Sequence, residues 1–158
     1  MIHQLINLKF HEYLSQIHYH IVFSTKNRVP SLDKANRKLL YKYIWGVLKK
    51  NRCYLYRING TENHIHLLIH LHPSVSLANL IKDIKLAGSD FIKRKNLFPN
   101  FTGWQKGYGA FTHHVRDKHR LIKYIKNQEE HHKKMSWREE FRALLEEHEI
   151  NFNEKYLI

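Results

Sequence analysis

The sequence predicts an α+β fold in which a four-stranded antiparallel sheet carries two helices on one face. Three observations support this prediction: short segments in which apolar and polar residues alternate, longer segments with apolar residues at helical spacing, and the order of these segments along the chain. That order is strand, helix, strand, strand, helix, strand, which is the split βαβ arrangement of ferredoxin-like folds.

The predicted strands are four short segments rich in β-branched or aromatic residues. They are HYHIVFS (18–24), CYLYRI (53–58), HIHLLIHLH (64–72) and GYGAFTHH (107–114). In the first strand Tyr19, Ile21 and Phe23 share one side. This pattern is typical of a strand with one face toward a core.

Two core helices are indicated by apolar residues spaced three and four apart. The first begins after Asp33, and the second follows the third strand with Ser74 or Ser76 as its N-cap. The expected apolar stripe of the first helix consists of Leu39, Leu40, Tyr43, Ile44, Val47 and Leu48. The expected stripe of the second consists of Leu77, Leu80, Ile81, Ile84 and Phe91.

Two further helices are expected after the last strand. The first covers about 117–134, and the second begins with a capping-box pattern formed by Ser136 and Glu139. The apolar residues of the second are Phe141, Leu144 and Leu145. We therefore expect one domain, 1–158, with a core over about 18–134 and a helical extension over about 135–158.

The composition is strongly basic, with 27 Lys and Arg against 14 Asp and Glu and a net charge of +13. A polyanion is the expected partner, nucleic acid rather than a membrane, and a merely solvated basic surface is the alternative. The single cysteine, Cys53, excludes an intramolecular disulfide, and no apolar run is long enough to span a bilayer. We expect a cytoplasmic protein.

The third strand carries an unusual row of histidines within TENHIHLLIHLHP (61–73). Alternation places them all on the face without the two core helices, and the first strand adds His18 and His20 beside them. The row consists of His64, His66, His70 and His72. Two imidazoles at i and i+2 can converge on one divalent metal. The spacing leaves the pairs 18/20, 64/66 and 70/72 open, with a solvated histidine face as the alternative.

A tyrosine and an amide lie four residues apart in RLIKYIKNQEEHH (120–132). On a helix Tyr124 and Gln128 would share one side. Taken alone, this tyrosine is more simply interpreted as a packing residue beside Leu121 and Ile125.

Three segments together, ENHIHLLI (62–69), GYGAF (107–111) and YIKNQEEHH (124–132), resemble the single-tyrosine HUH transposases of the insertion-sequence 200/605 type and the related REP-associated tyrosine transposases. The resemblance covers about 18–132. It implies that His64 and His66 are metal ligands, that Gln128 is the third protein ligand, and that Tyr124 is the nucleophile.

Two features depart from the family pattern. Many members have aspartate where this chain has Asn63, which bears on how the first histidine is oriented. The segment beyond Met135 corresponds to an extension found only in some members, and its role stays open.

The resemblance implies a DNA transposase that cleaves and rejoins single-stranded DNA at hairpin-bearing ends through a 5′-phosphotyrosine, with Mg²⁺ or Mn²⁺ as cofactor. It also implies a homodimer with shared active sites. The helix of Tyr124 must then cross the open face of the sheet or dock on another subunit. By topology, the basic residues expected nearest the site are Lys26, Arg28 and Lys106.

Three other functions stay open. The chain could be a domesticated REP-associated transposase or another HUH single-strand nuclease. It could also be a noncatalytic ferredoxin-like RNA- or DNA-binding module, which would need base-stacking aromatics on the open sheet face. The alternation of the first strand argues against the last function, because it puts the rings of Tyr19 and Phe23 on the side of the helices.

Overall fold

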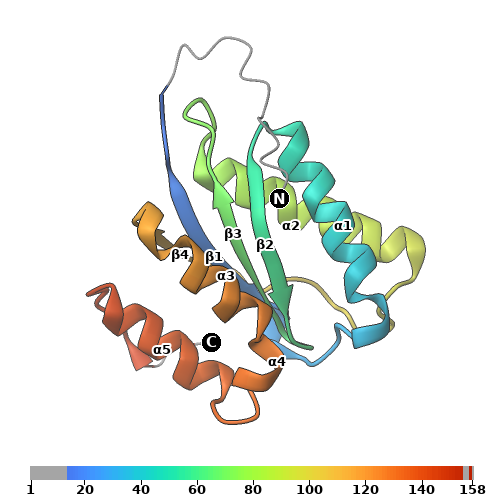
Figure 1. Ribbon diagram of the computed structural model, residues 1–158. Helices are drawn as coiled ribbons and strands as arrows, with labels where there is room; N and C mark the ends of the chain where they lie inside the picture. Colours follow the sequence, from blue (N-terminus) through green and yellow to red (C-terminus); the bar gives the residue numbers. More distant parts are fainter. Residues whose placement is uncertain (1–13, 155–156, 158) are drawn as a thin grey trace.

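The computed structural model describes residues 14–154 and 157 and has the expected α+β architecture (Figure 1). One antiparallel sheet has the strand order β2-β3-β1-β4. Its strands are β1 (His18–Ser24), β2 (Tyr54–Gly60), β3 (His64–His70) and β4 (Gly109–His113). The prediction of a ferredoxin-like sheet is confirmed, with the first and third strands as central neighbours.

The helices α1 (Lys34–Lys50) and α2 (Leu77–Lys95) pack against one another on one face of this sheet (Figure 1). The Asp33 side chain caps α1 by accepting from the Asn36 N–H. The Ser76 side chain caps α2 in the same way, by accepting from the Asn79 N–H. Of the two serines expected as the N-cap, Ser74 and Ser76, the structure therefore uses Ser76.

The main core lies between the sheet and these two helices. Its fully buried members include Ile21, Phe23, Leu40, Ile44, Leu48, Ile65, Leu67, Ile69, Leu80, Ile81 and Ile84. The prediction that Leu39 belongs to the core is wrong, because its side chain is 51% exposed. It precedes Leu40 by one position, a rotation of about 100° around the helix, so it points away from the sheet.

The opposite face of the sheet is covered by the C-terminal part of the chain (Figure 1). From α3 (Lys118–Lys126), Leu121 and Ile125 pack on Leu68 of β3. From α5 (Trp137–Glu147), Trp137, Leu144 and Leu145 join a second cluster with Val22 and Phe111. The part of the histidine face that carries His20, His64 and His66 is therefore a buried interface.

The capping box of α5 is confirmed, because Ser136 accepts from the Glu139 N–H while the Glu139 carboxylate accepts from the Ser136 N–H. The prediction of a single helix over about 117–134 is wrong. The segment forms α3 and the short α4 (Gln128–His131), with Asn127 between them at φ −97° and ψ 21°. The side-chain amide of Asn59 donates to the carbonyls of Ile125 and Lys126, which stabilises the end of α3 at this point.

Two short 3₁₀ turns, η1 (Lys26–Arg28) and η2 (Val115–Asp117), follow β1 and β4. No helix in residues 14–154 has both the length and the apolar character needed to cross a membrane.

Candidate active site

The histidines of β3 divide between two environments. His64 and His66 are fully buried beneath the C-terminal helices. His70 instead accepts a hydrogen bond from the Ile17 N–H at 3.1 Å, and His18 contacts Gln16 and Tyr56. Of the three histidine pairs that the spacing allowed, the structure brings only 64/66 together with Tyr124 and Gln128.

His20 of β1 supports this pair from the neighbouring strand. Its Nε2 lies 2.8 Å from Nδ1 of His66, and the two rings stack with centroids 5.1 Å apart. The register places His66 opposite Val22, so His20 approaches it diagonally across the antiparallel strands. His20 therefore fixes the His66 ring and leaves its Nε2 facing the centre of the cluster.

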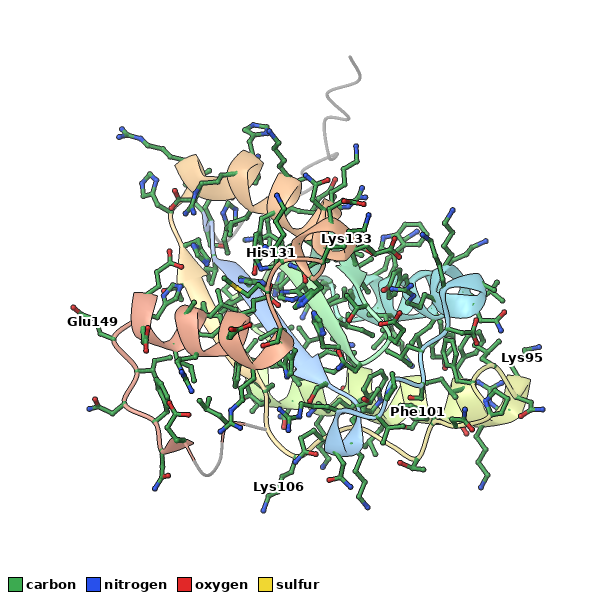
Figure 2. The ribbon with its side chains drawn as sticks, turned by 90° about the horizontal axis from the view of Figure 1, so that it is seen from below. Lys95, Phe101, Lys106, His131, Lys133 and Glu149 are labelled. Carbon is green, nitrogen blue, oxygen red and sulfur yellow. The ribbon has the colours of Figure 1, made fainter. Side chains whose placement is uncertain are left out.

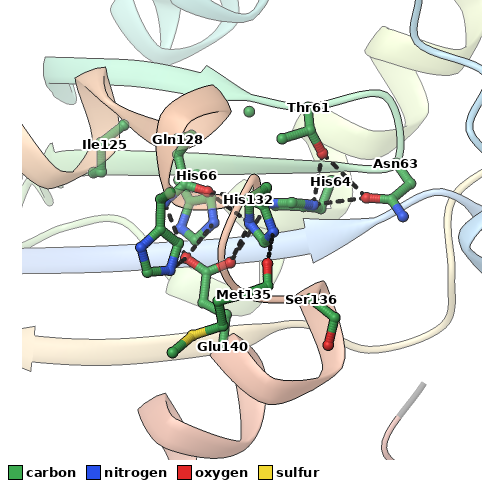
Figure 3. A network of polar contacts seen from close by, with 12 residues as sticks. Thr61, Asn63, His64, His66, Ile125, Gln128, His132, Met135, Ser136 and Glu140 are labelled. Carbon is green, nitrogen blue, oxygen red and sulfur yellow. Dashed lines mark hydrogen bonds and ion pairs between the residues drawn. The ribbon is translucent and has the colours of Figure 1, made fainter.

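His64 is oriented by the loop that precedes β3 (Figure 3). Its Nδ1 lies 2.7 Å from Oδ1 of Asn63 and 3.0 Å from Oγ1 of Thr61. An Nδ1–H that donates to Asn63 leaves Nε2 as a lone pair, which is the form that a metal requires. Asn63 thus supplies an acceptor that orients the His64 ring.

Gln128 enters the cluster from the first residue of α4. Its Oε1 lies 3.2 Å from Nε2 of His64 and 3.1 Å from Nε2 of His132. In this tautomer His64 Nε2 and Gln128 Oε1 are both acceptors, and two acceptors that face one another are typical of ligands sharing a cation. Tyr124 lies one turn earlier, with its ring centroid 5.9 Å from that of His66.

Glu140 reaches the same cluster from α5 (Figure 3). Its Oε1 accepts from the Tyr124 hydroxyl and, at 2.9 Å, from the Gln128 amide. Its Oε2 lies 2.7 Å from Nε2 of His132. This carboxylate is only 2% exposed and joins three helices at one point.

The donor atoms fit a divalent cation. His64, His66, His132 and Glu140 each offer a ligand atom, and these atoms lie within 4.8 Å of one another. Within the described chain, Nε2 of His66 is buried without a hydrogen-bond partner. Imidazole nitrogens and carboxylate oxygens together suit a divalent transition metal.

Burial sets the charge of the cluster. It lowers the pKa of His20 and His64 well below the ordinary value, with His66 adding to the effect, so both rings are neutral. Burial alone would raise the pKa of the Glu140 carboxyl, but the hydrogen bond with His132 and the electrostatic effect of His66, whose Nε2 lies 3.5 Å from Oε1, outweigh it and hold that pKa well below its usual range. Burial and the Glu140 carboxylate raise the pKa of Tyr124 above that of a free phenol.

The basic residues expected near the site lie at one end of the sheet. Lys26 and Arg28 form η1 directly after β1, and the Thr25 N–H donates to the Asn63 carbonyl at 2.9 Å, which places η1 beside the loop before His64. Lys106 is exposed and points away from the body of the protein (Figure 2). None of the three contacts the cluster directly within the described chain.

Sequence reasoning missed His132 and Glu140. His132 follows Gln128 by four residues, a spacing that predicts a shared side of a helix. Glu140 lies three residues after Trp137 and four before Leu144, which makes it a charged residue within an apolar stripe. A charge at a buried position is rarely tolerated unless it is paired, so this pattern could have identified it.

The neutral histidines predict that the metal-free protein loses stability in mild acid. Unfolded histidine titrates near pH 6.5, whereas His20 and His64 keep a lower pKa in the fold. Below about pH 6.5 the unfolded state binds more protons, so the free energy of unfolding falls by up to ~1.4 kcal/mol per pH unit for each such histidine. Urea unfolding with a chelator between about pH 7 and 5 measures this slope.

The variant His20→Gln, which removes one of these titrating groups, should give a shallower slope. A protein that gains stability on acidification would contradict the assignment of neutral rings.

Comparison with known proteins agrees with the geometry. None of the curated proteins compared matches the chain. A solved structure from Deinococcus radiodurans R1, provisionally assigned as a transposase, shares 22% identity at a TM-score of 0.59 and covers 76% of this chain and 96% of its own. A REP-associated tyrosine transposase bound to a REP hairpin shares 15% identity at a TM-score of 0.58, covering 78% of this chain and 73% of its own.

Because both identities are below 25%, these two structures show only that this chain shares their fold. The family itself is shown by a sequence model described as transposase IS200 like, which matches residues 13–128 and therefore more than half of the chain. This chain belongs to the IS200-like transposase family.

Proposed function

We propose that this transposase cleaves and rejoins single-stranded DNA at hairpin-bearing ends, with Tyr124 forming a 5′-phosphotyrosine. One observation carries the proposal: the Tyr124 hydroxyl hydrogen-bonds to Glu140 inside the buried cluster that also contains His64 and Gln128. A packing tyrosine would not need a buried carboxylate as its partner. The hairpin-bound structure of a REP-associated transposase supports a hairpin substrate.

We assign His64, His66 and Gln128 as the ligands of a divalent ion, with His132 and Glu140 as further donors. When bound, such an ion polarises a nonbridging oxygen of the scissile phosphate. Of the two expected ions, Mn²⁺ fits the imidazole-rich donors better than Mg²⁺, which strongly prefers oxygen ligands.

The phenol proton has a defined acceptor in this cluster. As Tyr124 Oη bonds to phosphorus, the bond from phosphorus to the 3′-oxygen breaks. The phenol proton passes to Glu140 only as the new bond forms and makes that proton acidic, because the low pKa of Glu140 and the raised pKa of Tyr124 disfavour transfer beforehand. The 3′-oxygen leaves as an alkoxide, takes up a proton from water and becomes a free 3′-hydroxyl, and Glu140 then releases the phenol proton to solvent. One phosphodiester replaces another, so a 3′-hydroxyl can attack the phosphotyrosine in return and rejoin the strand.

We propose that one chain supplies every residue of the cluster, because α3 packs on the sheet of the same chain. The homodimer with shared active sites that the resemblance implies stays a prediction. The alternative of a noncatalytic module that stacks bases on an open sheet is not supported, since α3, α4 and α5 cover the face opposite α1 and α2 (Figure 1).

Replacing the nucleophile tests the proposal most directly. Tyr124→Phe removes one oxygen and keeps the ring contacts with His20 and His66, so folding and DNA binding should persist while the covalent adduct disappears. The measurement is incubation with Mn²⁺ and single-stranded DNA labelled at either end, followed by peptide sequencing. Tyr108→Phe, at an exposed position, is the matched control. Label on another residue, or a 3′-phosphotyrosine, would overturn the mechanism.

Removing ligands should separate cleavage from binding. His64→Ala, His66→Ala or Gln128→Ala should reduce adduct formation by about 10²-fold or more, because each side chain holds the ion that polarises the scissile phosphate. Hairpin affinity should stay nearly unchanged. His70→Ala on the same strand should have a milder effect, since His70 contacts Ile17 instead. The opposite ranking of these variants would move the metal site along β3.

Glu140→Gln tests the proton acceptor. The amide keeps the shape of the side chain but is a far weaker base, so adduct formation at saturating Mn²⁺ should slow by about 10²- to 10⁴-fold. Glu139→Gln is the matched control, because a glutamine still completes the capping box on the exposed side of α5. Wild-type rates for Glu140→Gln would show that the phenol proton goes elsewhere.

A further inference from the structure

A basic groove runs along α3 and α4 beside Tyr124. Its volume is about 560 Å³, and it is open to solvent on one side. The side chains along it include Arg120, Lys123, Tyr124, Asn127, His131 and Lys134. Arg120, Lys123, Tyr124 and Asn127 recur every three or four residues, so they form a stripe along one side of α3. His131 of α4 and Lys134 after it extend this stripe beyond the turn at Asn127. Tyr124 lies within the stripe, between Arg120 and His131.

The positive charge of the groove is available to a ligand. Lys123 and Lys134 are exposed, and neither forms an ion pair with any residue in the described part of the chain. The acidic residue at the groove, Glu130, is already paired with Lys133 at 2.7 Å. Its neighbour Glu129 is turned toward α1.

Glu129 pairs there with Lys34 at 2.7 Å and with Arg37 at 3.0 Å. The two acidic residues of α4 are thus neutralised by other bases, and the two lysines keep their full charge toward solvent. Such a surface is complementary to a chain of phosphates.

The length and depth of the groove favour a single strand. From Arg120 to Asn127, where α3 ends, the stripe extends about 10 Å at 1.5 Å per residue, more than the distance between successive phosphates. Tyr124 lines the groove and is only partly exposed, so an extended strand can bring a phosphate to it more easily than a rigid duplex can.

We infer that this groove holds the single-stranded DNA that flanks the scissile phosphate, with Lys123 and Lys134 binding phosphates on the two sides of Tyr124. The inference rests on the proposed function, because it takes Tyr124 as the group that the phosphate must reach. It assigns strand binding to α3 and α4 rather than to Lys26, Arg28 and Lys106 at the end of the sheet.

Lysine protection locates the strand without any need for cleavage. The wild-type protein, in chelator, is acetylated alone, with a blunt DNA hairpin, and with the same hairpin bearing a single-stranded tail, and each lysine is quantified by mass spectrometry. Lys123 and Lys134 should be protected several-fold by the tailed hairpin and much less by the blunt one. Lys38 and Lys82, exposed on α1 and α2 across the sheet, should react equally in all three samples.

A matched pair of double variants gives the second measurement. Removing Lys123 and Lys134 together (Lys123→Ala with Lys134→Ala) should weaken binding of the tailed hairpin and reduce the slope of log K against log salt by about 1.4, or about 0.7 for each lost phosphate contact. Lys38→Ala with Lys82→Ala makes the same change in net charge and should leave the slope unchanged. An equal effect of both double variants, or no protection of Lys123 and Lys134, overturns the inference.

The two proposals fail separately. Protection of the two lysines by the tail, without any Tyr124 adduct under Mn²⁺, would support the groove and overturn the proposed cleavage. An adduct on Tyr124 with Lys123 and Lys134 equally reactive with and without the tail would support cleavage and overturn the groove.

Discussion

A buried carboxylate, that of Glu140, connects the C-terminal helices to the sheet. A charge in this position is costly unless every lone pair finds a partner. Here one oxygen accepts from Tyr124 and Gln128, and the other lies against His132. These partners come from α3, from α4 and from the turn after it. Satisfying one buried charge therefore fixes the nucleophile, the amide and a histidine relative to one another.

The strand β3 supports this arrangement because its two sides have different chemistry. Ile65, Leu67 and Ile69 face α1 and α2 in the main core, while His64 and His66 face the C-terminal helices. A strand held between two neighbours and covered on both faces has little freedom to move. Two imidazoles separated by one residue are thus presented to Gln128 and Glu140 by a strand that is packed on both faces.

The charges of α4 and its surroundings are distributed unevenly. Glu129 pairs with bases of α1, and Glu130 pairs with Lys133, so the acids of α4 offset little of the positive charge beside Tyr124. Part of the positive charge of the chain therefore lies on a surface next to the candidate nucleophile. Long-range attraction of a polyanion and local binding of its phosphates would then act at the same place.

The sequence by itself determined the sheet, its two covering helices and the capping box of α5, because alternation, helical spacing and caps are local patterns that depend on near neighbours in the chain. The same patterns put His64 and His66 on one side of a strand and Tyr124 and Gln128 on one side of a helix. Only the tertiary structure decided which histidine pair lies next to Tyr124. It also brought His132 and Glu140 into the cluster. Glu140 comes from a helix whose docking depends on contacts of Trp137 and Leu144 with β1 and β4, and no local pattern specifies such distant contacts.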